Sequence, residues 1–89
     1  SGGTDGPTIT SITSRTSKVG SPATIKGTGF STTKTKNVVY FGTKKVKTIK
    51  RAKATSLTGV IIPRVKKGIV DVYVVVDGEK SNVFSFQVK

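Results

Sequence analysis

The sequence predicts an all-β fold, a small sandwich of about seven short strands in two sheets. Threonine, valine and isoleucine are abundant, whereas leucine is represented by Leu57 alone, a composition that favours pleated strands over helices. Apolar and polar residues alternate in several short stretches. Glycine-containing turn signals separate these stretches at intervals of about ten residues, which is typical of a β-sandwich.

The chain has 89 residues, enough for one domain with one core. Residues 1–6 contain nothing to bury, so we expect them to be a flexible linker or the remnant of a tag. We expect residues 7–89 to form a single domain. Because the chain starts at Ser1 rather than at methionine, we also expect it to be a piece of a longer protein.

The first predicted strand is Thr8–Thr13. Its two apolar residues, Ile9 and Ile12, are three positions apart, which breaks strict alternation and predicts a bulge between them. The polar stretch Ser14–Gly20 is predicted to be a loop.

The second predicted strand, Ser21–Thr28, directs Ala23 and Ile25 to one face. It ends in two glycines that flank a single residue and precede Phe30. Because glycine tolerates backbone conformations that a Cβ penalises, we expect a sharp corner here, with Phe30 filling the core beneath it.

The middle of the chain alternates between strands and polar turns. Val38–Phe41 reads as a strand that ends at the turn Gly42-Thr43, and Lys44–Lys53 follows as a basic strand-and-turn region. Leu57–Ile62 is the next predicted strand. Pro63 marks its end, because proline donates no hydrogen bond to a ladder.

The clearest element is Gly68–Val76, in which alternate valines define a buried face. Asp77-Gly78 then predicts a tight hairpin turn. The chain returns as the predicted strand Ser81–Val88, with Phe84 and Phe86 on one face.

Composition argues against catalysis. The chain contains no histidine and no cysteine, so it has no side chain that ordinarily titrates near neutral pH and no thiolate nucleophile or metal ligand. It has four acids, which are Asp5, Asp71, Asp77 and Glu79. We therefore expect that the chain is not an enzyme, and we assign no catalytic, cofactor-binding or metal-binding residue. No apolar run approaches the roughly 18–20 residues of a membrane span.

Several motifs in order resemble the IPT/TIG domain, an immunoglobulin-like β-sandwich. The opening motifs are PTITSI at residues 7–12 and VGSPATIKGTGF at residues 19–30. The later ones are VYFG at 39–42, ATSLT at 54–58, IIP at 61–63, GIVDV at 68–72 and SNVFSF at 81–86. The resemblance extends over nearly the whole chain.

This resemblance implies a function without catalysis. Its bacterial extracellular members are similar to this chain in their threonine- and glycine-rich style and short loops. They imply a structural or accessory module that spaces or presents the neighbouring domains of a larger extracellular or cell-surface protein. The partners would be those neighbouring domains, and the isolated domain would be a monomer.

A second hypothesis rests on charge, since sixteen lysines and arginines against four acids give a formal net charge of +12. Six cations are concentrated in one segment, where alternation could align part of them as a stripe for an anionic polymer such as nucleic acid, a cell-wall polymer or a glycan. They are Lys44, Lys45, Lys47, Lys50, Arg51 and Lys53. The alternative is that these lysines form an ordinary solvated surface, as the dispersed ones do.

A third hypothesis is carbohydrate binding. Sugar platforms use exposed aromatic rings, and in the absence of tryptophan the candidates are Tyr40 and Tyr73, both predicted on the outward side of strands. The alternative is that the two tyrosines pack against each other across neighbouring strands.

Overall fold

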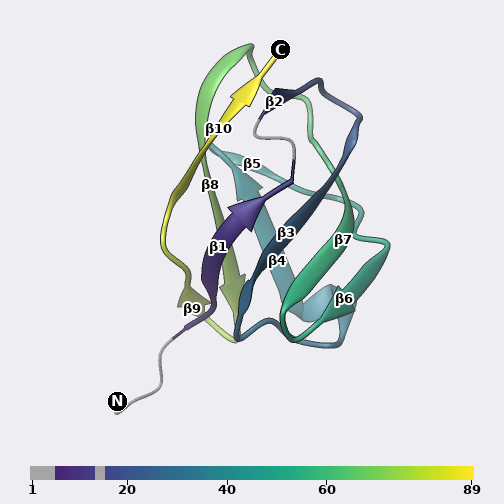
Figure 1. Ribbon diagram of the computed structural model, residues 1–89, viewed down its shortest axis with the longest axis vertical. Helices are drawn as coiled ribbons and strands as arrows, with labels where there is room; N and C mark the ends of the chain where they lie inside the picture. The colour runs from purple at the N-terminus through teal and green to yellow at the C-terminus, as the bar shows by residue number, and fades with distance from the viewer. Residues whose placement is uncertain (1–5, 14–15) are drawn as a thin grey trace.

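Two β-sheets packed face to face form the protein (Figure 1). The computed structural model describes residues 6–13 and 16–89. The smaller sheet has four strands in the order β1 (Thr8–Ile12), β3 (Pro22–Thr28), β7 (Ser56–Ile61) and β6 (Arg51–Lys53). All of its pairings are antiparallel.

The larger sheet has six strands. Five follow the order β2 (Thr16–Ser17), β10 (Phe84–Val88), β8 (Gly68–Val76), β4 (Asn37–Phe41) and β5 (Lys44–Lys45), and β9 (Glu79–Lys80) also pairs with β8. A single 3₁₀ turn, η1 (Lys34–Lys36), precedes β4. The order β1-β3-β7-β6 is that of the four-stranded sheet of an immunoglobulin domain, and β10-β8-β4 is that of its three-stranded sheet, to which β2, β5 and β9 are added here. The predicted all-β sandwich is confirmed.

The structure divides the predicted strands more finely than the sequence pattern does. Residues 1–5, in the predicted linker, and residues 14–15, in the predicted loop Ser14–Gly20, lie outside the described residues. The predicted loop also contains a short strand, because Thr16–Ser17 forms β2 beside β10. The basic region contributes two short strands, β5 and β6, in different sheets.

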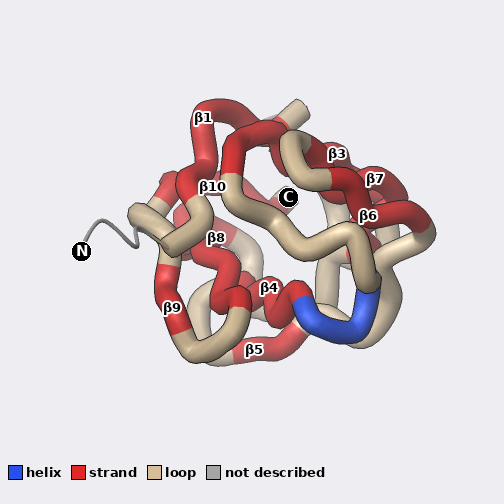
Figure 2. Tube along the Cα trace, turned by 90° about the horizontal axis from the view of Figure 1, so that it is seen from below, coloured by secondary structure: helices blue, strands red, loops and turns tan. Residues whose placement is uncertain are grey.

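The two sheets face each other across the core (Figure 2). The buried side chains between them are mostly aliphatic, with a few aromatic rings. Phe41 on β4 and Phe86 on β10, which flank β8 in the larger sheet, meet edge to face with ring centroids 5.3 Å apart. Most of the inward positions predicted from alternation are buried, among them Ala23, Ile25, Phe30, Val39, Phe41, Leu57, Val72, Val74, Val76 and Phe86. Val70 and Phe84, predicted on the same faces, are half-buried against this core.

The bulge predicted in the first strand is confirmed. The register between β1 and β3 shifts between Ile9 and Ser11. This extra residue turns both Ile9 and Ile12 inward, and both are 3% exposed.

The predicted glycine corner is also confirmed, but the two glycines act differently. A Cβ on Gly27 would overlap the carbonyl oxygen of Thr8, so this position needs glycine for the close approach of β1 and β3. Gly29 has φ +77°, which allows the chain to turn. Phe30 is 5% exposed beneath the corner.

The predicted return strand Ser81–Val88 is wrong in its first half. After the Asp77-Gly78 turn, whose φ angles of 51° and 81° are those of a tight hairpin, the chain forms β9 and then breaks before β10. Buried Ser81 replaces the ladder at the break: its backbone N–H donates to the Val74 carbonyl at 2.7 Å, and its hydroxyl oxygen accepts from the Val74 N–H at 2.8 Å.

The chain enters and leaves the sandwich at opposite ends. β1 begins beside the β8–β9 turn at the bottom of Figure 1, and the chain reaches Lys89 at the top. β2 and β10 run parallel, with Thr16 opposite Gln87 and Ser17 opposite Val88. The N–H of Lys89 also donates to the Ser17 carbonyl at 2.8 Å.

Candidate functional site

The basic segment, residues 44–53, crosses from one sheet to the other. Its first two residues form β5 and pair with β4, and the Val46 N–H continues that pairing by donating to the Val39 carbonyl at 2.8 Å. The segment then changes partner, because the Ile61 N–H donates to the Thr48 carbonyl at 3.1 Å and β6 pairs with β7. The segment therefore closes one edge of the sandwich.

This crossing divides the six cations of the segment. Lys44, Lys45 and Lys47 lie on the side of the larger sheet, whereas Arg51 and Lys53 lie on the outer strand of the smaller one. Lys50 lies against Gly59, where its side chain fills the space that a Cβ would occupy. The alternation from which a stripe of part of these cations was predicted does not extend through the segment, since β5 and β6 lie in different sheets.

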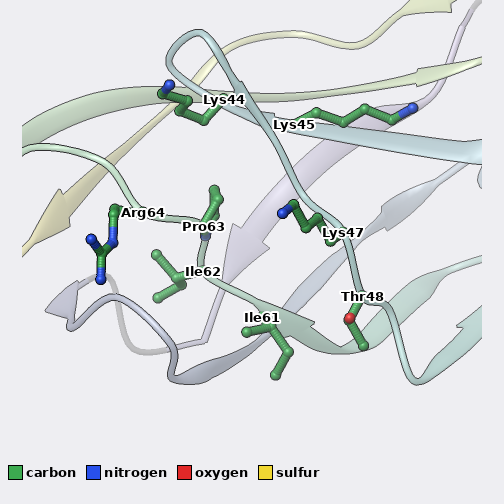
Figure 3. A pocket seen from close by; sticks show the side chains of 8 residues that line it. All are labelled: Lys44, Lys45, Lys47, Thr48, Ile61, Ile62, Pro63 and Arg64. Atoms are coloured by element: carbon green, nitrogen blue, oxygen red, sulfur yellow. The ribbon is translucent and has the colours of Figure 1, made fainter.

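Three of the cations surround a groove between the two sheets (Figure 3). One wall is the chain from Lys44 to Thr48, and the other is the end of β7 with the residues that follow it. The groove has a volume of about 520 Å³, within the usual range of roughly 300–1,000 Å³ for small-ligand sites. Its lining residues are Lys44, Lys45, Lys47, Thr48, Ile61, Ile62, Pro63 and Arg64.

The lining of this edge groove combines cations with aliphatic surface. Among the described residues, its charged members are three lysines and one arginine, and no acid lines it. Ile62 is 1% exposed and forms part of an apolar floor with Ile61 and Pro63. Anions are therefore attracted to the rim of the groove, while apolar groups can be buried at its floor.

Arg64 is the member of the groove that sequence reasoning missed. It follows Pro63 in the chain, and its sequence position gives no sign that β5 lies opposite it. Arg64 could have been identified only from a prediction that β5 and the end of β7 lie at the same edge of the sandwich. That β5 and the residues after β7 line the same groove depends on long-range topology rather than on local pattern.

Lys45 and Lys47 also line a second hollow, of about 390 Å³, on the other side of the crossing. There they face Lys34 and the buried side chain of Asn37. The Asn37 amide is fully used in holding the preceding loop: its oxygen accepts from the Ser31 N–H, and its nitrogen donates to the Ser31 and Thr33 carbonyls.

The two candidate sugar-binding tyrosines pack against each other. Tyr40 and Tyr73 are directly opposite in β4 and β8, with stacked rings whose centroids are 5.1 Å apart. The ammonium of Lys80, on β9, lies 4.4 Å from the Tyr73 ring centroid. Because β4 and β9 flank β8 on opposite sides, the two faces of the Tyr73 ring are both covered, which argues against a flat sugar platform there.

The described acids do not assemble a site. Asp71, Asp77 and Glu79 are exposed, and two of them belong to the β8–β9 turn region. Within residues 6–13 and 16–89, no group of three or more histidine, cysteine, aspartate or glutamate side chains could hold a metal ion. No helix in that part of the chain is long and apolar enough to cross a bilayer.

Comparison with protein families gives one clear match. A family model described as IPT/TIG domain matches residues 7–88, which is almost the whole chain. Comparison with curated proteins gives no match.

Three similar solved structures agree on the fold. A structural genomics protein of unknown function from Bacteroides thetaiotaomicron VPI-5482 has a TM-score of 0.86 at 24% identity over 98% of this chain. The γ-CGTase from alkalophilic Bacillus clarkii has a TM-score of 0.85 at 25% identity over 94% of this chain. SGBP-B from a complex xyloglucan utilization locus in Bacteroides uniformis has a TM-score of 0.70 at 21% identity over 96%.

In each case this chain corresponds to a minor part of the other protein. It covers 22% of the first of the three chains, 12% of the second and 24% of the third. The same fold therefore occurs as one module within longer polypeptides.

Proposed function

Because the chain belongs to the IPT/TIG domain family, we propose that it is a non-catalytic structural module that spaces or presents the neighbouring domains of a larger protein. The observation that carries this proposal is the position of the two chain ends. The chain enters β1 at one end of the sandwich and reaches Lys89 at the other (Figure 1). Domains attached before and after such a module are separated by the length of its sheets.

The pairing of β2 with β10 supports a mechanical role. Once β1 has separated from β3, a pull on the two ends draws β2 from its start and β10 from its finish, in opposite directions along parallel strands. All hydrogen bonds between the two strands, including the one from Lys89 to Ser17, are then loaded together rather than one after another. This geometry resists separation better than one in which the strands peel apart.

The comparisons support the module as part of a larger protein. The three similar structures carry the fold within chains of which it occupies between 12% and 24%. One of them is an enzyme, the γ-CGTase, and another comes from a xyloglucan utilization locus. We propose by analogy that this module belongs to an extracellular or cell-surface bacterial protein that handles a polymeric substrate, with the chemistry performed elsewhere.

Composition agrees with a role outside catalysis. The chain has no histidine or cysteine, and the described acids are dispersed and exposed. Its polar side chains with defined partners, such as Asn37, Ser81 and Asn82, hydrogen-bond to backbone groups of the chain. These residues hold loops and strand ends in place.

Single-molecule pulling tests the mechanical role. The full chain is stretched in two geometries, once through its two ends and once between Lys89 and a cysteine introduced as Lys18→Cys, which is unique because the chain has none. Residue 18 directly follows β2, so the second geometry peels β2 from β10 at one end. We expect a higher rupture force end to end than in the peeling geometry. Equal or lower force end to end would contradict the proposal.

A further inference from the structure

β5 leaves one backbone edge unpaired beside the groove. It ends the strand order of its sheet, and within the described residues no strand pairs with its second edge. The Val46 N–H bonds to the Val39 carbonyl, and Lys45 lies opposite Tyr40. Because hydrogen-bonded and non-hydrogen-bonded pairs alternate in an antiparallel ladder, the N–H and carbonyl of Lys45 point away from β4.

The groove beside that edge has an aliphatic floor. Ile61, Ile62 and Pro63 line it, and in the part of the chain that the structure describes no aromatic ring does. An aliphatic surface favours apolar side chains through area removed from water, whereas sugar rings are held better by flat aromatic faces. The floor thus favours a peptide over a glycan.

The rim of the groove selects for negative charge. In Figure 3 the ammonium of Lys47 points across the groove toward Pro63, and the guanidinium of Arg64 lies on the opposite wall. Lys44 lies above them, whereas Lys45 extends away from Arg64. Lys44, Lys47 and Arg64 thus border the groove that Lys45 of β5 also lines, and among the described residues no acid lines it to offset them.

We propose that this groove binds an extended acidic peptide segment that adds to the free edge of β5. Peptides that join a sheet edge use main-chain hydrogen bonds for affinity and alternate side chains for specificity. Here the backbone of Lys45 receives the peptide, and the apolar side chains of the peptide contact half-buried Ile61 and Pro63. The alternate acidic side chains meet Lys47 and Arg64. This binding is a property beyond the spacing role and does not depend on it.

The test is a titration of the ¹⁵N-labelled chain, followed by amide chemical shifts. The probe is a short peptide that alternates glutamate with valine, and its comparison is the same peptide with lysine in place of glutamate. We expect the glutamate peptide to shift the amides of residues 44–48 and 61–64, and the lysine peptide to leave them unchanged. A third peptide carries N-methyl groups on the amides that face β5, and we expect it to bind at least fivefold more weakly.

Matched variants locate the binding site. The double substitution Lys47→Glu with Arg64→Glu should weaken the glutamate peptide at least tenfold. The control is Lys18→Glu with Lys26→Glu, which makes the same change in charge at exposed positions that do not line the groove. We expect the control to change affinity less than twofold. Thermal denaturation of both variants verifies that they are folded.

Three outcomes would overturn the proposal. The first is equal weakening in the two double variants, which would indicate attraction to net charge alone. The second is unchanged binding of the N-methylated peptide, which would exclude addition to the strand edge. The third is a preference for an oligogalacturonate or a single-stranded oligonucleotide of equal charge with shifts at the same residues, which would assign the groove to an anionic polymer.

Discussion

At the residue scale, an exposed side chain can stabilise the fold through its hydrogen bonds. Asn82 is exposed, yet its amide oxygen accepts from the Ile9 N–H at 2.7 Å and its amide nitrogen donates to the Ile9 carbonyl at 3.0 Å. It therefore pairs with the outer edge of β1 as a neighbouring strand would. One side chain from the break between β9 and β10 thus holds the first strand of the smaller sheet.

Replacement of Asn82 should destabilise the protein despite its exposure. Asn82→Ala leaves the N–H and carbonyl of buried Ile9 without their partners, so we expect the free energy of unfolding to fall by about 1–3 kcal/mol. Chemical denaturation measures the change. The control is Gln87→Ala, at an exposed position of β10, for which we expect less than about 0.5 kcal/mol. Similar losses in both variants would refute the pairing role of Asn82.

A second prediction separates steric from conformational demand for glycine. Gly27→Ala forces β1 away from β3 at Thr8, and we expect a loss of about 2–3 kcal/mol. Gly78→Ala, at φ +81° with open space around it, carries the conformational cost alone, about 1 kcal/mol. Denaturation curves of the two variants compare them. If Gly78→Ala cost as much as Gly27→Ala, the close approach of β1 would not be the reason for glycine at position 27.

At the scale of elements, the sequence pattern correctly predicted the strands and turns whose conformation is determined by neighbouring residues. The alternation of Gly68–Val76 and the Asp77-Gly78 turn gave β8 and its hairpin correctly, because burial of one face and positive φ leave direct marks in sequence. The interruption of the strand at Ser81 has no signal in the sequence. It depends on a hydrogen bond from the Val74 N–H to the Ser81 hydroxyl oxygen, which replaces a backbone partner of the ladder.

The basic segment illustrates the same limit for the candidate site. Its charge was evident in the sequence, but its crossing between sheets depends on partners in β4 and β7 that are distant in the chain. Alternation therefore predicted one stripe where the structure has two groups. Arg64 joins one group solely because the end of β7 meets β5 across the sandwich edge.

Cross-strand stacking of Tyr40 with Tyr73 gives a prediction for β4 and β8. A double-mutant cycle with Tyr40→Ala and Tyr73→Ala should yield a coupling energy of about 0.5–1.5 kcal/mol, because each single change removes the same aromatic contact. Thermal or chemical unfolding of the four proteins supplies the cycle. Additive losses would show that the two rings do not stabilise the pairing of their strands.

At the scale of the whole molecule, the net charge of +12 opposes compaction. Sixteen cations and four acids on an 89-residue chain leave most cations without an opposite charge, and their repulsion is relieved on unfolding. Salt screens this repulsion, since the Debye length falls from about 30 Å at 0.01 M to about 3 Å at 1 M.

The melting temperature should accordingly rise with salt. From 0.01 M to 0.3 M sodium chloride we expect about 1 kcal/mol of added stability, equivalent to about 4–8 °C for a domain of this size. Calorimetry at neutral pH measures it. The double variant Lys18→Glu with Lys26→Glu, with lower net charge, should respond less. A melting temperature that falls with added chloride would contradict a stability limited by repulsion.

The spacing role is tested most directly by the distance between the neighbours of this domain in a longer protein that carries it. Small-angle scattering compares that protein with a version from which residues 7–89 are deleted. β8 has nine residues at about 3.3 Å each, so we expect the deletion to shorten the maximum dimension by about 30 Å. An unchanged dimension, with the domain folded back against a catalytic neighbour, would contradict the account.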